Sequence, residues 1–136
     1  MMRVAGWLLG FSLLASPALA ADPATSIKSL IDRQIEAFLA DDGATAYSFA
    51  SPRLQEVFPN PDVFMSMVKS AYRPVYRPQS VAFGRLRDQN DAYIQEVFLV
   101  DPDGVEWTAL YALQQQPDGS WRIAGCQLTK EPRVSA

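Results

Sequence analysis

The sequence contains no histidine and only one cysteine, Cys126. The absence of histidine removes the usual general base, the commonest zinc ligand and one partner of every Ser–His or Cys–His nucleophile pair. A lone cysteine cannot form an intramolecular disulfide, and the C-x-x-C motifs of redox and haem-attachment proteins are missing as well. The sequence therefore gives no support to zinc enzymes, thiol-redox proteins or histidine-dependent hydrolases. Because Gly125 and Cys126 close an apolar segment, we expect the thiol to be buried rather than redox-active.

Acidic residues are missing from the centre of the chain. Residues 63–87 contain no Asp or Glu but carry Lys69 and four arginines, which are Arg73, Arg77, Arg85 and Arg87. These arginines form a candidate patch for an anion or a protein partner, and the alternative is that they are solvated on different faces. The whole chain has a formal net charge of −3 and lacks a recognisable nucleic-acid-binding motif, so we expect no nucleic acid as a partner.

Long apolar runs are confined to the first twenty residues, which have the pattern of a secretory signal peptide. Arg3 supplies the positive charge, residues 4–15 form the apolar segment, and Ala18-Leu19-Ala20 gives a small-residue site with cleavage after Ala20. The apolar segment is shorter than the roughly 20 residues that a membrane span needs. We therefore expect a periplasmic or secreted protein whose mature form has no membrane span. The alternative is an uncleaved membrane anchor.

The mature chain is expected to form one domain over residues 21–130, followed by a flexible tail over residues 131–136. Its first half is predicted to be helical. Apolar residues three and four positions apart predict a helix between Asp22 and Ala40, and capping residues followed by glycine or proline predict three further helical segments. Those segments are residues 43–49, 52–58 and 61–72.

The second half is predicted to be a sheet, because the period of the apolar pattern changes to two after Tyr72. The repeated Tyr-Arg-Pro of residues 72–78 predicts an irregular edge strand, since proline restricts the residue before it and cannot donate to a ladder. Four further strands are predicted at residues 81–86, 92–100, 105–115 and 120–128. The predicted fold class is α+β, with N-terminal helices packed on one face of a curved antiparallel meander sheet of four to five strands.

Several short motifs are spread along the whole mature chain. In the helical half they are Gln34, Ala37-Phe38, Asp41-Asp42, Ala46-Tyr47 and Ser51-Pro52. In the second half they are Tyr72, Pro74-Val75, Trp107, Tyr111 and the closing segment Gly119-Ser120-Trp121-Arg122-Ile123-Ala124-Gly125-Cys126. Together these motifs resemble an uncharacterised bacterial family, domain of unknown function 4864, and the closing segment is the most specific of them.

More distantly, three helices before a curved sheet look like the nuclear-transport-factor-2-like fold, which ketosteroid isomerase, scytalone dehydratase and many binding modules share. That resemblance implies a conical pocket between the sheet and the helices. It leaves the use of the pocket open, because a fold does not determine a function. The catalytic residues of those enzymes cannot be mapped onto this chain residue by residue, and the dehydratase pattern includes a histidine that is missing here.

The candidate pocket residues are aromatic: Tyr47, Tyr72, Trp107, Tyr111 and Trp121. The tyrosines can donate hydrogen bonds to a ligand, whereas the tryptophans either stack on a ligand or pack across neighbouring strands. The catalytic candidate is Glu96 acting with Tyr111. Glu96 shares a strand row with large apolar residues and would be a base if that row faced inward. The alternative is that Glu96 lies on a partly wet face or pairs with an arginine such as Arg122.

These features favour an exported, non-catalytic module that binds a small apolar ligand in the cone, or a protein partner, without settling whether the protein is an enzyme. The alternative is a cofactor-free isomerase, dehydratase or hydrolase that uses a pocket carboxylate and a tyrosine. A third class would act through its surface alone. We expect no cofactor and no metal, because the two acids of residues 101–104 are too few for a calcium loop. A homodimer formed by packing sheet on sheet is a further option.

Overall fold

The computed structural model describes residues 22–90 and 92–132. The predicted signal peptide, residues 1–20, and residues 133–136 of the predicted tail lie outside these ranges. Within them, five helices precede four strands. The helices are α1 (Pro23–Leu39), α2 (Gly43–Ser48), α3 (Pro52–Val57), α4 (Pro61–Ala71) and α5 (Arg73–Tyr76). The strands are β1 (Ser80–Gln89), β2 (Ala92–Val100), β3 (Glu106–Gln115) and β4 (Trp121–Lys130).

The first four helices each begin at a side chain that caps the helix. Asp22 accepts from Ala24 N at 3.4 Å, Asp42 from Thr45 N at 3.2 Å, Ser51 from Leu54 N at 3.3 Å and Asn60 from Val63 N at 2.9 Å. Each cap satisfies a backbone N–H that has no partner inside its helix. The predicted starts of these four helices are confirmed.

The four strands form one antiparallel sheet in the order β1-β2-β3-β4, as the predicted meander requires. The tight connections use residues with positive φ: Asn90 (+56°), Gly104 (+80°) and Gly119 (+87°). Two bulges interrupt the ladders, one in β1 between Phe83 and Leu86 and one between Ala112 and Leu113. The buried Gln95 holds the first bulge, since its Nε2 donates to Gly84 O at 3.2 Å and to Arg85 O at 3.3 Å.

The edge strand predicted over residues 72–78 is wrong, because Arg73–Tyr76 forms the short helix α5. Pro74 lies in the first turn of this helix, where a backbone N–H would have no intrahelical partner in any case, so proline does not break it. Pro74 and Val75 are buried, and Tyr76 N donates to Tyr72 O at 2.9 Å. Tertiary burial therefore outweighs the local preference of Arg73 for an extended backbone.

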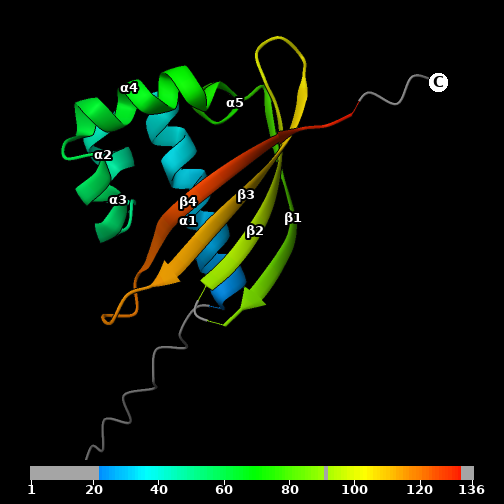
Figure 1. Ribbon diagram of the computed structural model, residues 1–136. Helices are drawn as coiled ribbons and strands as arrows, with labels where there is room; N and C mark the ends of the chain where they lie inside the picture. The colour runs from blue at the N-terminus through cyan, green and yellow to red at the C-terminus, as the bar shows by residue number, and fades with distance from the viewer. Residues whose placement is uncertain (1–21, 91, 133–136) are drawn as a thin grey trace, which may run out of the picture.

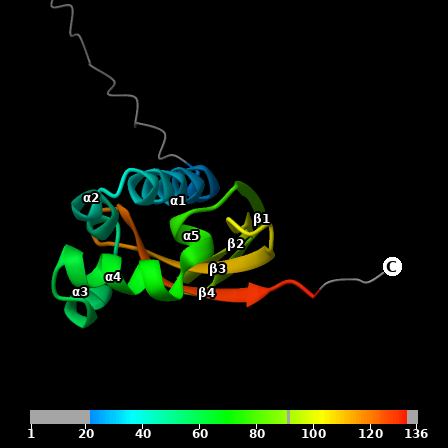
Figure 2. The ribbon, with the colours of Figure 1, turned by 90° about the horizontal axis from the view of Figure 1, so that it is seen from above.

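The helices and the sheet share one hydrophobic core. Figure 1 and Figure 2 show α1 lying across one face of the sheet, with α2, α3 and α4 gathered beside β4. Apolar residues of α1 such as Ile27 and Ile31 belong to the same buried cluster as Val97, Leu99 and Leu113 of the sheet. The α+β class with helices before an antiparallel sheet is thus confirmed. Across the described ranges, every helix is too short or too polar to cross a membrane.

The end of the sheet extends slightly beyond the predicted strand. β4 continues to Lys130, and Glu131 N donates to Glu106 O at 3.0 Å. Thr108 Oγ1 also donates to the Glu131 carboxylate. Glu131, the first residue of the predicted tail, is therefore hydrogen-bonded to β3.

Candidate ligand cavity

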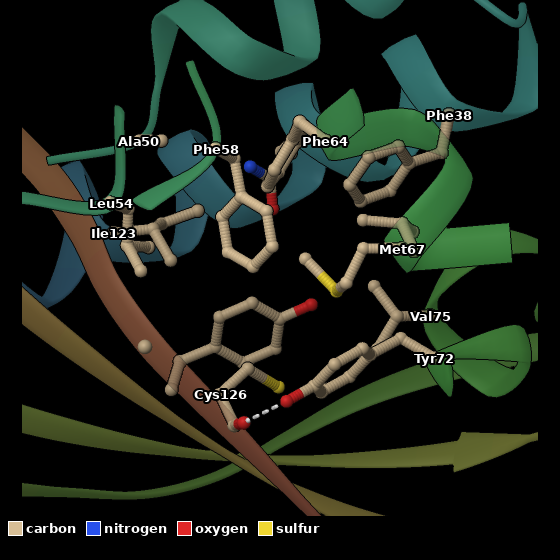
Figure 3. Close-up of a pocket in the computed structure, with 14 residues that line it drawn as sticks. Phe38, Ala50, Leu54, Phe58, Phe64, Met67, Tyr72, Val75, Ile123 and Cys126 are labelled. Carbon is tan, nitrogen blue, oxygen red and sulfur yellow. Dashed lines mark hydrogen bonds between the residues drawn. The ribbon is translucent and has the colours of Figure 1, made fainter. Parts of the chain in front are cut away.

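A cavity of about 300 Å³ lies between the helical layer and β3 and β4. Figure 3 shows the labelled Phe38, Phe58 and Phe64 on the helical side of this space, with Tyr72 and Cys126 facing them. The complete lining is Gln34, Phe38, Ala50, Leu54, Phe58, Phe64, Met67, Val68, Tyr72, Val75, Tyr111, Ile123, Gly125 and Cys126. The lining is almost wholly apolar and contains no charged side chain.

The walls of the cavity come from segments that are far apart in the chain. A parallel bridge between Ala50 and Ile123 ties the start of α3 to β4, with Ser51 N donating to Ile123 O and Ile123 N donating to Phe49 O, both at 2.8 Å. Phe64 lies 6.2 Å from Phe38 and 6.1 Å from Phe58 between ring centres, so the three rings form a continuous wall. The cavity is therefore framed by backbone hydrogen bonds and aromatic packing.

Tyr111 supplies an unusual polar group to this apolar space. Its side chain is 1 % exposed, and its hydroxyl has no hydrogen-bond partner among the described residues. A buried hydroxyl without a partner costs free energy, so buried polar groups are normally paired. Burial, and to a smaller degree the neighbouring Cys126, raise the pKa of Tyr111 well above its usual value. The phenol therefore stays protonated and can donate a hydrogen bond into the cavity.

Two other titratable groups border the cavity, and both are neutral at physiological pH. Tyr72 donates its hydroxyl to Cys126 O at 3.0 Å, the hydrogen bond drawn in Figure 3. Burial, followed by Cys126, raises the pKa of Tyr72. Cys126 lines the cavity, and burial raises the pKa of its thiol from 9.0 to about 12. Cys126 is therefore a poor nucleophile here, because the thiolate is the reactive form.

Gln34 adds a polar group that is already engaged. Its Nε2 donates to Ala46 O at 3.1 Å, and the residue is 3 % exposed. Tyr47, a predicted pocket residue, does not line the cavity. Its hydroxyl donates to Gln55 O at 3.0 Å and to Phe58 O at 2.5 Å, so it holds α3 and Phe58 in place. Tyr47 therefore supports the cavity wall at Phe58 without lining the cavity itself.

The other predicted aromatic residues lie away from the cavity. Trp107 is half-buried, and its Nε1 donates to Asp101 Oδ2 at 3.0 Å. Trp121 makes an edge contact with Tyr93, with ring centres 5.1 Å apart, and borders a different surface depression. Of the five predicted aromatic candidates, the structure thus brings only Tyr72 and Tyr111 to this cavity.

Glu96 and Tyr111 lie on opposite faces of the sheet. In β2 the buried row is Gln95, Val97 and Leu99, so the row that contains Glu96 faces away from α1. Glu96 Oε1 accepts from Arg85 N at 3.2 Å, and it does not pair with Arg122, whose Nη1 donates to Ser48 O. The inward position that would have made Glu96 a base is not observed.

The four arginines of the predicted patch do not line one depression. Arg77 pairs with Asp41 at 2.9 Å, and Arg73 lies 3.7 Å from Asp103. Both border a shallow depression beside α5, whereas Arg85 and Arg87 are exposed on β1 and do not line it. In residues 22–90 and 92–132, the structure also holds no cluster of three or more His, Cys, Asp or Glu suited to a metal ion.

Most of the cavity wall was not identified from the sequence. The apolar face of α4 that carries Phe64, Met67 and Val68 was expected, but as a packed helix face rather than a cavity wall. Phe58 and Val75 lie next to proline-rich breaks whose conformation the local sequence does not determine. Periodicity indicates which side chains turn inward, and the space left between them depends on how the helices cross.

One comparison with known proteins identifies a family. A family described as "Domain of unknown function (DUF4864)" matches residues 20–136. No curated protein and no solved structure matches the chain.

Proposed function

The chain belongs to the family described as domain of unknown function DUF4864, and we propose that it is an exported, non-catalytic module that holds a small, neutral, mostly apolar molecule in the cavity at Tyr111. The observation that carries the proposal is the buried Tyr111 hydroxyl, which has no hydrogen-bond partner among the described residues. A ligand with one acceptor atom would satisfy it. Specific ligand pockets commonly combine an apolar lining with a few polar groups of this kind.

The volume limits the size of the ligand. An apolar cavity of about 150 Å³ is known to accept benzene. The cavity here measures about 300 Å³, which suits a molecule of roughly two rings or an aliphatic chain of similar bulk. The ring faces of Phe38, Phe58 and Phe64 favour a flat ligand, because aromatic rings gain from offset or edge contacts.

The ligand is expected to be neutral. The lining contains no Lys, Arg, Asp or Glu, and the three titratable groups, Tyr72, Tyr111 and Cys126, are uncharged at physiological pH because their pKa values are raised. An ionised carboxylate or amine would lose its hydration without gaining a counter-charge, which is costly. Ketones, aldehydes, esters, ethers and quinones carry the required acceptor without a charge.

Binding is favoured over acid–base catalysis by the arrangement of the side chains. An isomerase or dehydratase of the alternative kind needs a carboxylate within reach of its tyrosine. The acidic candidate Glu96 is on the other face of the sheet, and no carboxylate lines the cavity. Tyr111 alone can orient a ligand but has no partner base.

The finer description of the fold and the location belong to the same proposal. Helices packed over an antiparallel sheet with a cavity between them are consistent with a nuclear-transport-factor-2-like cone. Export to the periplasm or the medium is proposed from the signal-peptide pattern of residues 1–20 alone. An exported carrier of a water-insoluble molecule would combine these features.

A pair of probes tests the proposed ligand class. The neutral ketone 2-acetylnaphthalene and the anion 2-naphthoate share one ring system, and their binding can be followed by ¹⁵N–¹H NMR titration. We expect saturable shifts around the cavity with the ketone and at least about tenfold weaker binding of the anion. Equal binding of the two probes, or shifts confined to residues outside the cavity, would overturn the proposal.

A cavity-filling variant locates the bound probe. Met67 is half-buried on α4, and Figure 3 shows its side chain directed into the space between Phe58 and Tyr72. Met67→Trp should block the ketone while the protein stays folded. Val63→Trp is the matched control, because Val63 is on the same helix but is 44 % exposed and does not line the cavity. Unchanged binding in Met67→Trp would place the probe elsewhere.

The natural ligand can be sought by native mass spectrometry. The wild-type chain and Met67→Trp would be purified gently from the producing cells and weighed before and after denaturation. We expect a mass excess on the wild type that denaturation removes, and no excess on Met67→Trp. An excess of the same mass on both proteins would show that the co-purifying molecule is not in the cavity.

A further inference from the structure

A second depression, of about 520 Å³, lies on the surface where α1, the end of α2 and the start of β4 meet. Its lining is Ser26, Ser29, Leu30, Arg33, Ser48, Phe49, Ser120, Trp121 and Arg122. It shares no lining residue with the cavity at Tyr111. The backbone bridge between Ala50 and Ile123 separates the two, because Phe49 borders the depression while Ala50 and Ile123 border the cavity.

The charged groups that line this depression are all positive. Two arginines come from different elements, Arg33 from α1 and Arg122 from β4, and four serines surround them. No Asp or Glu lines the depression, although the chain as a whole carries 15 acidic and 12 basic residues. A cationic recess in an acidic protein is the arrangement that concentrates an anion at one place.

Both arginines are held in position by groups that carry no charge of their own. Arg122 Nη1 donates to the backbone carbonyl of Ser48, and the guanidinium of Arg33 lies 5.0 Å from the centre of the Phe49 ring. The ion pairs found among the described residues involve Arg73 and Arg77, not these two. A guanidinium bound to one carbonyl keeps further N–H donors for a ligand.

Three acidic residues lie close to the depression without lining it. Asp118 accepts from Ser120 N at 2.9 Å and from Ser120 Oγ at 2.6 Å, which holds the turn before β4. These bonds are the main cause that lowers the pKa of Asp118, and the charge of Arg122 adds to the effect, so Asp118 compensates part of the Arg122 charge. Asp32 and Glu36 are exposed neighbours of Arg33 on α1. They reduce the positive potential at long range, so binding would depend on direct hydrogen bonds from the two guanidinium groups rather than on a diffuse field.

We infer that the Arg33–Arg122 depression is a second binding site, which takes the oxyanion of a small molecule whose flat apolar part lies against Trp121. The forked N–H donors of arginine match a carboxylate, phosphate or sulfate oxygen pair. The unpaired hydroxyls of Ser26 and Ser29, which make no side-chain hydrogen bond within the described residues, can add donors. Leu30 and Trp121 supply the apolar surface beside them.

Phenyl phosphate and inorganic phosphate are suitable probes, titrated at constant ionic strength while the indole N–H of Trp121 is followed by NMR. We expect both to saturate below about 10 mM, with phenyl phosphate binding more tightly because its ring gains contact with Trp121. Failure of either probe to saturate, or a shift at Trp107 in place of Trp121, would overturn the inference.

Charge-removing variants distinguish a site from general attraction. Arg33→Gln and Arg122→Gln should each weaken phenyl phosphate by about tenfold or more, since hydrogen bonds between charged groups are the strong ones. Arg87→Gln makes the same charge change at an exposed position of β1 and should alter binding less than about twofold. Equal losses in all three variants would show only a bulk electrostatic effect and would contradict the site.

Further variants serve as controls for folding, for the geometry of the arginine side chain and for the independence of the two sites. Arg33 is exposed, so Arg33→Gln is expected to fold even if Arg122→Gln loses stability together with its bond to Ser48. Arg122→Lys keeps the charge and loses the fork, and it should recover only part of the affinity. Met67→Trp, which fills the other cavity, should leave phosphate binding unchanged; a parallel loss would contradict the independence of the two sites.

Discussion

The substitution Tyr111→Phe should change ligand affinity and protein stability in opposite directions. The hydroxyl is buried and has no partner among the described residues, so removing it breaks no hydrogen bond of the free protein. It removes the donor offered to a ligand. A hydrogen bond between neutral groups contributes about 0.5–1.5 kcal/mol, so an acceptor ligand should bind roughly 2- to 12-fold more weakly.

The free protein should become more stable. Leaving a hydroxyl buried without a partner costs about 1–3 kcal/mol, and Tyr111→Phe removes this cost while opening a gap of only one oxygen atom. We therefore expect a gain of about 1 kcal/mol, equivalent to a rise in Tm of about 4 °C for a domain of this size. Tyr72→Phe is the matched control, because its hydroxyl does have a partner, Cys126 O at 3.0 Å. It should lose about 1 kcal/mol.

The assay combines thermal unfolding with titration of two near-isosteric probes. 2-Acetylnaphthalene has a carbonyl acceptor, and 2-isopropenylnaphthalene has a methylene group in its place. Tyr111→Phe should weaken the first and leave the second unchanged or slightly stronger. Loss of stability in Tyr111→Phe, or an equal change of affinity for both probes, would refute the role given to this hydroxyl.

Three further predictions concern stability. Burial raises the pKa of Cys126 from 9.0 to about 12, so the stability that the buried neutral thiol contributes is fully present below pH 9 and is lost as the pH rises towards 12. In urea titrations the free energy of unfolding of Cys126→Ala should therefore fall less steeply over this pH range than that of the wild type, and an identical fall would contradict the prediction. The hydrogen bond from Trp107 is the main cause that lowers the pKa of Asp101 below 3.8, so the stability that this bond contributes is lost as the pH falls through the pKa of Asp101 in the folded protein. Trp107→Phe should therefore unfold in acid at a higher pH than the wild type. An unchanged midpoint of acid unfolding would show that the bond does not stabilise the fold. A Cβ at Gly84 would overlap Glu96 Oε1 and lie 2.8 Å from the Phe98 ring. The end of the Glu96 side chain can move aside but the ring must shift as well, so Gly84→Ala should cost about 1 kcal/mol in urea unfolding, and Glu96→Ala should recover only a small part of it; a neutral substitution would show that the strand relaxes freely.

Local chemistry made much of the fold predictable. Asp42, Ser51 and Asn60 each cap the helix that the sequence pattern placed after them, because capping depends on atoms only a few residues apart. The starts of β2 and β3 follow from the turns in the same way, whereas β1 was predicted over residues 81–86 and continues to Gln89, into the predicted connection. The edge strand predicted over residues 72–78 was wrong because of tertiary packing. Burial of Pro74 and Val75 favours a helical turn, although a proline on its own favours an extended backbone at the residue before it.

The candidate site was less predictable. Tyr72 and Tyr111 were identified as possible hydrogen-bond donors to a ligand, and both border the cavity. The position of Glu96 was left open because both rows of β2 are apolar, so alternation could not determine which one meets α1. Arg33 and Arg122 were not singled out as a pair, since they are far apart in the chain and only the folded arrangement brings them to one depression.

A crystal structure of the mature protein soaked with 2-acetylnaphthalene would test directly whether Tyr111 holds a neutral ligand in the cavity. We expect electron density for the probe in the cavity lined by Phe58, Met67 and Tyr111, with the carbonyl oxygen about 2.7 Å from Tyr111 Oη. A cavity closed by its own side chains, or a probe bound there with its carbonyl turned away from Tyr111, would contradict this expectation.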